Sequence, residues 1–128
     1  MVYLIDTHIF IWYARGVKRL SPNFTETINS PDNRIIISTA SLWEIAIKVR
    51  LGKLELDVSF EEMNDYLKGL NIEQLGFEAS DLQQLIHLPF HHRDPFDRLI
   101  IFQAINNNFV LMPDDPKFKL YSVQLLQP

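Results

Sequence analysis

Residues 34–52 read RIIISTASLWEIAIKVRLG, and this stretch contains the two signals on which the fold prediction depends. Arg34–Ser38 is apolar and rich in β-branched side chains, which is typical of a buried strand. Ser41–Leu51 follows as a predicted helix, and Gly52 is suited to end it. The stretch therefore predicts a strand followed directly by a helix.

The same alternation continues on both sides of this unit. Strands that alternate with helices and carry near-continuous apolar runs imply a parallel sheet covered by helices on both faces. We therefore expect residues 1–128 to form a single α/β domain. The further predicted strands are Val2–Ile5, Asn71–Leu75, Phe109–Met112 and an edge strand at Val123–Leu126. The further predicted helices are Thr7–Ala14, one that starts at Ser21 with Pro22 in its first position, Ser59–Leu70, Ser80–His87 and Pro95–Asn106.

The composition excludes several classes of protein. The chain of 128 residues is 47% hydrophobic and 22% charged, so it can bury a core. The absence of cysteine excludes a disulfide scaffold, a thiolate metal site and a cysteine nucleophile. The opening MVYLIDTHIF does not resemble a signal peptide, and no apolar run approaches the roughly 20 residues that span a bilayer. We expect a cytoplasmic protein without a membrane partner.

Carboxylates follow the predicted strands. Asp6 comes directly after the first strand, and Glu44 lies in the first turn of the helix after the second. Asp114 and Asp115 follow the strand at 109–112. In an open parallel sheet, ligands bind outside the carboxyl ends of the strands, so these groups are expected at the ligand-binding edge. Strand order, which the sequence does not give, decides whether they converge.

Asp94 and Asp97 begin the helix that leads into the strand at 109–112. That helix runs antiparallel to the sheet, so its start lies at the same edge. Carboxylates that converge repel one another unless a cation relieves them. Oxygen ligands favour Mg²⁺ or Mn²⁺, and an acidic site holding one or two such ions suits phosphodiester hydrolysis.

All of these acids except Asp6 also have a structural interpretation, whereas a charged residue that ends an apolar strand needs a partner or a ligand. Asp94 precedes Pro95 and is well placed as a helix N-cap, and Asp97 would then complement the helix dipole. Glu44 lies three residues after Ser41, which is the spacing of a capping box. Asp114 and Asp115 would build a turn before a proline. The histidines are expected in surface or packing roles, and the tryptophans in the core or at an interface.

Four segments together, YLIDTHIFIW, ISTASLWEIAIKVRLGKL, HHRDPFDRLIIFQA and VLMPDDPKFKLY, resemble a PIN-domain ribonuclease of the VapC toxin type. The resemblance covers nearly the whole chain in the right order. It implies a three-layer α/β/α sandwich with a central parallel sheet. It also implies a Mg²⁺- or Mn²⁺-dependent endoribonuclease with RNA as substrate, a VapB-like antitoxin as partner and a homodimeric assembly.

The resemblance assigns the site residue by residue. Asp6, Glu44 and Asp97 match the first three metal-ligating acids, and Asp115 matches the position of the fourth. Asp94 belongs to the HRDPFDR variant of the third motif, as an additional ligand or a cap. Pro113 stands where the family often has threonine. This departure leaves open whether Asp114 takes the place of Asp115.

Arg93 and Arg98 flank the acids and are expected to contact RNA phosphates, with an ion pair from Arg98 to Asp94 as the alternative. The net charge of −4 becomes +1 when the five predicted acidic ligands are set aside, so it does not exclude RNA. Two other functions remain open. One is a receiver-like signalling domain with Asp57 as phosphoacceptor, and the other is a non-catalytic binding module on the same fold.

Overall fold

The computed structural model describes residues 1–89, 94–114 and 116–128. Its centre is a four-stranded sheet in the order β3-β2-β1-β4, in which every neighbouring pair is parallel. The strands are β1 (Val2–Ile5), β2 (Arg34–Ser38), β3 (Glu73–Leu75) and β4 (Val110–Met112). The helices are α1 (Thr7–Arg15), α2 (Pro22–Asn29), α3 (Thr39–Arg50), α4 (Phe60–Gly69), α5 (Ala79–Leu85) and α6 (Pro95–Asn107), and a 3₁₀ helix spans Pro116–Leu120.

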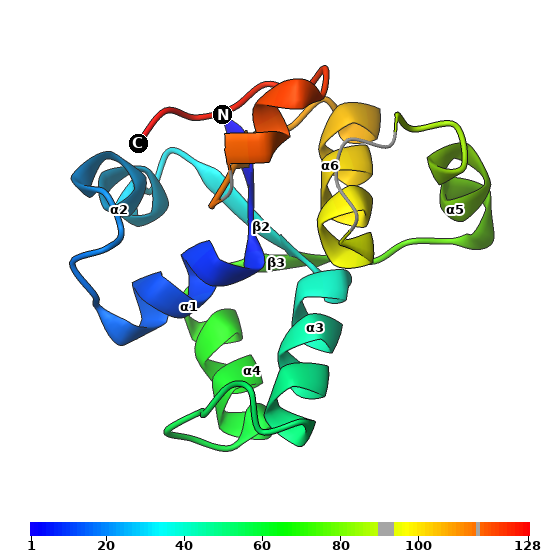
Figure 1. Cartoon of the computed structure of the whole chain (residues 1–128). Coiled ribbons are helices and arrows are strands. Elements are labelled where there is room, and N and C mark those ends of the chain that lie inside the picture. The colour runs from blue at the N-terminus through cyan, green and yellow to red at the C-terminus, as the bar shows by residue number, and fades with distance from the viewer. Residues whose placement is uncertain (90–93, 115) are drawn as a thin grey trace.

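Helices cover both faces of the sheet, which confirms the predicted three-layer α/β/α architecture (Figure 1). Alternate strand residues point to opposite faces. Ile5, Ile37 and Met112 pack with side chains of α1 to α4, whereas Leu4 and Leu111 pack with α6 and the 3₁₀ helix. The central strands are thus buried on both sides, as their continuous apolar runs predict. No helix within the described ranges is long and apolar enough to cross a bilayer.

Helix α3 starts earlier than predicted. Ser38 is its N-cap, because the Ser38 hydroxyl accepts a hydrogen bond from the amide of Ala40 at 3.1 Å. Ser41 is fully buried inside the helix and Glu44 lies in the second turn. The interpretation of Ser41 and Glu44 as a capping box is therefore wrong. The cap predicted at Asp94 is confirmed by a hydrogen bond from a first-turn amide, and Ser21 and Ser59, which begin two of the predicted helices, accept the same kind of hydrogen bond.

The edge strand predicted at 123–126 is also wrong. This segment forms one isolated bridge, between Leu125 and Leu111. The Val123 amide donates to the carbonyl of Tyr121 at 2.9 Å, so a tight turn uses the donor that a strand ladder would need.

The strand order explains which segments meet at the functional edge. From β1 the chain adds β2 and then β3 on one side, and β4 lies on the other side of β1. The direction of winding therefore reverses between β1 and β4, and ligands bind at such a reversal point. Ile5 pairs with both Ile37 and Met112, so the residues that follow these three strands lie level at one edge.

Candidate functional site

Asp6 occupies the centre of this edge. It ends β1 and caps α1, because its Oδ1 accepts a hydrogen bond from the Thr7 amide at 2.7 Å. Its Oδ2 accepts from the Asp114 amide at 3.4 Å. The residue is 0% exposed. Burial raises the pKa of the Asp6 carboxyl well above its usual range, and the hydrogen bond and charge of Asp114, followed by the charge of Asp97, raise it further.

Glu44 reaches the same edge from α3 and is held through both carboxylate oxygens. The Thr7 hydroxyl donates to Oε1 at 2.8 Å and lies 2.8 Å from the Ser41 hydroxyl. The Lys48 ammonium donates to Oε2 at 2.6 Å. Glu44 is only 2% exposed, so this ion pair is shielded on its acidic side. Because Thr7 follows Asp6 in the chain, one hydroxyl links the carboxylate on α3 to the end of β1.

Helix α6 contributes two acids from its first turn. Asp94 is the N-cap and accepts from the amides of Phe96 at 2.8 Å and Asp97 at 3.2 Å. The negative charges of Asp94 and Asp97 both raise the pKa of the Lys48 ammonium. Burial lowers the pKa of the Lys48 ammonium, but the hydrogen bond and charge of Glu44, followed by the charges of Asp94 and Asp97, outweigh burial and leave that pKa raised.

Asp114, after β4, is the acid that completes the group among the described residues. His8 pairs with it through Nδ1. Burial alone would raise the pKa of Asp114, but its hydrogen bonds to His8 and Asp6 outweigh that effect and the pKa is lowered. The pKa of His8 is raised, mainly by its hydrogen bond to Asp114 and against the effect of burial. Within the Asp6–Asp114 pair, the proton therefore resides more readily on Asp6.

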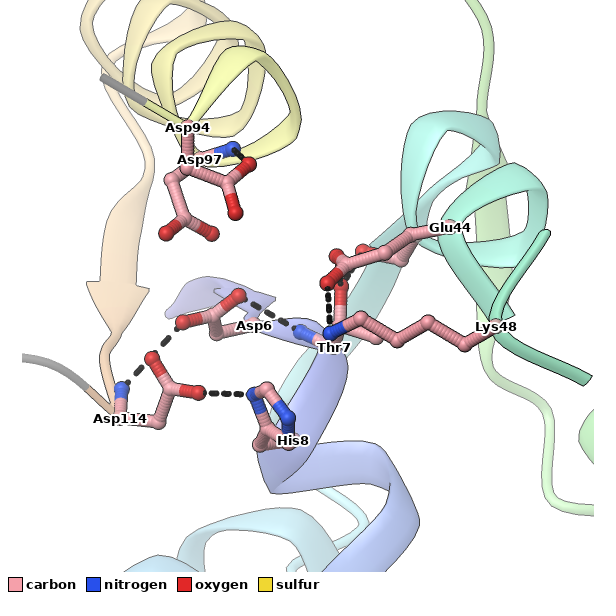
Figure 2. Close-up of polar contacts among 9 residues, drawn as sticks. Asp6, Thr7, His8, Glu44, Lys48, Asp94, Asp97 and Asp114 are labelled. Carbon is pink, nitrogen blue, oxygen red and sulfur yellow. Dashed lines mark hydrogen bonds and ion pairs between the residues drawn. The ribbon is translucent and has the colours of Figure 1, made fainter. Parts of the chain in front are cut away.

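Four separate segments thus deliver carboxylates to one space. Figure 2 shows Asp6, Asp97 and Asp114 turned toward one another, with Glu44 approaching from α3 and Asp94 at the start of α6. The sequence predicted this edge for Asp114 as well as for Asp6, Glu44, Asp94 and Asp97, and it left open only whether Asp114 takes the ligand role of Asp115. Asp115 and Arg93 lie outside the described residues, as do His91 and His92.

Arg98 contacts the backbone of the residues that precede α6, a contact that the sequence did not predict. Its guanidinium donates to the backbone carbonyls of Pro89 at 3.0 Å and Leu88 at 3.3 Å. The side chain therefore holds residues 88 and 89 against α6.

The donor set suits a hard divalent cation, because it consists of carboxylate oxygens alone around a buried aspartate that resists ionisation. In the described part of the chain, no group of three His, Asp or Glu side chains is arranged so that it could hold a metal ion without movement. The Glu44 oxygens are engaged by Thr7 and Lys48, so small side-chain shifts would be needed to hold a cation.

Sequence reasoning missed Thr7, Ser41, Lys48 and His8. Lys48 carries a detectable signal, since a lysine four residues after a glutamate on a helix is the spacing of an ion pair. The contacts of Thr7 with Ser41 and Glu44 span 34 and 37 residues and have no local signature. His8 was assigned to the surface or to packing, yet it contacts Asp114 across 106 residues.

Comparisons with known proteins identify a family and several similar solved structures. The family model of the PIN domain matches residues 3–123. Among solved structures, a chain of VapBC2 from Rickettsia felis bound to a promoter DNA fragment is similar, with a TM-score of 0.72, 21% identity, and coverage of 98% of both chains. A chain of VapBC-1 from nontypeable Haemophilus influenzae gives a TM-score of 0.66 at 18% identity over 99% of this chain and 98% of that chain. A chain of FitAcB from Neisseria gonorrhoeae gives 0.62 at 16% identity over 100% and 98%. No curated protein sequence matches the chain.

Proposed function

The chain belongs to the PIN domain family, and we propose that it is a metal-dependent endoribonuclease acting in the cytoplasm as the toxin of a toxin–antitoxin pair. The observation that carries this proposal is the environment of Asp6. A fully buried carboxyl at the reversal point of the sheet is surrounded by other carboxylates that make its ionisation costly. Such a cluster weakens the fold unless a cation occupies it, which favours a role in function.

We assign the metal-holding role to Asp6, Glu44 and Asp97, with Asp94 and Asp115 as further candidates from the sequence. Asp114 joins them because its carboxylate lies beside that of Asp6 (Figure 2). When bound, Mg²⁺ or Mn²⁺ would activate water and offset the charge that develops on the phosphate. The chain supplies the positioning. The Thr7 amide fixes the rotamer of Asp6, the Thr7 hydroxyl and Lys48 hold Glu44, and the amides of α6 hold Asp94.

The choice of RNA as substrate follows the family resemblance, and cationic groups near the acids support it. The Lys48 ammonium is close to the carboxylates, and its side chain is 33% exposed, so it can face a phosphate at the mouth of the site. Contacts of Arg93 and Arg98 with RNA phosphates stay predictions. Arg98 has a second role in this structure, since it also holds the carbonyls of Leu88 and Pro89.

A VapB-like antitoxin is the proposed protein partner, and the assembly is proposed to contain two copies of the chain. The similar solved structures are named as VapBC2, VapBC-1 and FitAcB. An apolar groove of about 360 Å³ between α1 and α4 offers a docking surface, with Ile11, Ala14, Val58 and Met63 in its lining. Ala14→Glu should abolish inhibition by the antitoxin and leave cleavage intact, whereas Ala46→Glu, outside this groove, should leave inhibition intact.

The receiver-like alternative is not supported. It requires Asp57 to follow a strand at the acidic edge. Residues 54–57 form no strand, and Asp57 lines the groove between α1 and α4. The remaining alternative, a non-catalytic binding module, predicts that the acidic edge binds no Mn²⁺ in calorimetry.

Cleavage of purified RNA tests the proposed function. We expect hydrolysis that requires added Mg²⁺ or Mn²⁺, that excess EDTA stops and that Asp6→Asn abolishes. A single-stranded DNA of the same sequence serves as the control for substrate class. Full activity of Asp6→Asn, or full activity in EDTA, would overturn the assignment.

A further inference from the structure

An exposed tryptophan stands beside the acidic site. Trp43 directly precedes Glu44 in α3 and is 58% exposed. Its ring centroid lies 5.2 Å from that of Phe96, which directly precedes Asp97 in α6. Each of the two acids therefore has an aromatic neighbour in the chain, and the two aromatic side chains meet between the helices. The pair connects α3 to α6 at the turns of these helices that carry Glu44 and Asp97.

The geometry of the pair leaves room for a third ring. The two ring planes are inclined by 85°, an edge-to-face arrangement. In such a contact, Phe96 covers at most one face of the Trp43 indole. Successive helix residues point about 100° apart. Glu44 is turned into the buried edge, so its neighbour Trp43 is turned away from it, toward α6 and solvent.

We propose that Trp43, supported by Phe96, is a stacking platform for an unpaired base of the RNA substrate next to the phosphate that is cleaved. This inference rests on the proposed ribonuclease function. Proteins that read single-stranded RNA commonly stack bases on exposed aromatic side chains. A base in a regular duplex is already stacked on both sides, so the platform selects unpaired RNA.

The charges around the pair agree with this assignment. The acids occupy the interior of the edge, and the ammonium of Lys48 lies at its border, on the same helix as Trp43 and five residues further along. A chain of RNA can then place a base on the indole while its phosphates meet a cation. Arg98 of α6 is held by the carbonyls of Leu88 and Pro89, so Lys48 is the cation on which this argument depends. A carboxylate surface without a cation at its border would repel the strand.

Kinetics with single-stranded RNA test the platform. Stacking is worth about 1–3 kcal/mol per base, so Trp43→Ala should raise KM about 5- to 150-fold and change kcat much less. Trp43→Phe, which keeps an aromatic face, should recover most of the loss. Phe60→Ala removes an aromatic residue that is 40% exposed on α4 and is the matched control, with KM expected to stay unchanged. An unchanged KM in Trp43→Ala would overturn the proposal.

Fluorescence gives a second readout that does not need cleavage. The chain has two tryptophans, so Trp12→Phe leaves Trp43 as the single indole. In this background, with Asp6→Asn added to prevent hydrolysis, a single-stranded oligoribonucleotide should quench the emission and a duplex of the same sequence should not. Equal quenching by both, or none by either, would contradict stacking.

Two outcomes separate this inference from its premise. If the wild-type chain fails to cleave RNA, the proposed function fails. If the wild-type chain cleaves RNA but Trp43→Ala has the same KM, only the platform fails. Sedimentation of Trp43→Ala tests whether a second copy of the chain, and not an RNA base, covers Trp43. A shift to a smaller species would show that Trp43 lies between two copies of the chain and would overturn the base-stacking role.

Discussion

Replacing Asp6 by asparagine should stabilise the fold while it removes the activity. Asparagine is as good an N-cap as aspartate, so the hydrogen bond from the Thr7 amide is kept. Its Nδ2 amide cannot accept from the Asp114 amide as Oδ2 does, but it can donate to the Asp114 carboxylate instead. What disappears is a carboxyl that is 0% exposed and that, in its ionised form, places a negative charge against Asp114. Two like charges about 4 Å apart repel by about 4 kcal/mol at the effective dielectric of a partly buried site.

The expected gain is smaller than that figure, because His8 already offsets part of the Asp114 charge. We expect Asp6→Asn to raise the free energy of unfolding by about 2 kcal/mol. For 128 residues, an unfolding entropy of about 2.1 cal/mol/K per residue makes each kcal/mol worth about 4 °C. The melting temperature at pH 8 in EDTA should therefore rise by about 7 °C.

The pH dependence of this gain follows from the direction of the pKa shifts. The pKa of Asp6 is raised above its ordinary 3.8, so the folded chain binds this proton more tightly than the unfolded chain. Wild type is therefore stabilised as the pH falls from above the raised pKa toward 3.8, and the advantage of the variant shrinks over that window. The pKa of Asp114 is lowered, so its own contribution is lost only below 3.8.

Differential scanning calorimetry at pH 8 and at about pH 5 measures both effects, with Asp65→Asn as the control for removal of an exposed carboxylate. That control should stay within about 0.5 kcal/mol of wild type. A melting temperature of Asp6→Asn at or below wild type at pH 8 would refute the reasoning, because it would mean that the site already neutralises its own charge.

Three further predictions concern the metal, the Thr7 hydroxyl and the end of α6. Mn²⁺ at about 100 times its dissociation constant should raise the melting temperature of wild type by about 10 °C, since binding adds about 2.7 kcal/mol; a rise that persists in Asp6→Asn would place the cation elsewhere. Thr7→Val should cost about 1–3 kcal/mol in urea unfolding and slow RNA cleavage, because the Glu44 carboxylate loses a buried donor. Thr7→Ser should behave close to wild type, and an equal loss in both variants would implicate packing. Asn108 ends α6 with φ of 56°, so Asn108→Ala should cost about 1–2 kcal/mol in the same titration and Asn108→Gly almost nothing, with cleavage unchanged in both.

The sequence predicted the elements better than their contacts. Apolar periodicity is a local property, so the α/β class and most helices and strands could be located, and the resemblance to the PIN family is confirmed by the family model. The start of α3 was misplaced because Ser38 and Ser41 are both acceptable caps, and only the path of the chain out of β2 selects Ser38. The last segment was misread because an isolated bridge and a strand have the same apolar pattern.

The candidate site shows the same difference between local features, which the sequence predicts, and long-range contacts, which it does not. The topology rule placed Asp6 and Glu44 at one edge, but their meeting depends on β1 lying between β2 and β4, which no local pattern encodes. The pairing of His8 with Asp114 depends on that strand order as well. The same strand order brings Asp114 to Asp6 at the edge where the sequence predicted it, and whether Asp114 takes the ligand role of Asp115 stays open.

Capping and function do not compete at this edge. Asp6 caps α1 and Asp94 caps α6, so both carboxylates sit at the positive ends of helix dipoles. That position normally lowers the pKa of an acid, and it also fixes the side chain by hydrogen bonds to backbone amides. The pKa of Asp6 is nevertheless raised, because burial and the neighbouring carboxylates outweigh the dipole and the cap. The protein's own groups therefore leave part of the negative charge uncompensated, and we infer that a bound cation supplies the remainder.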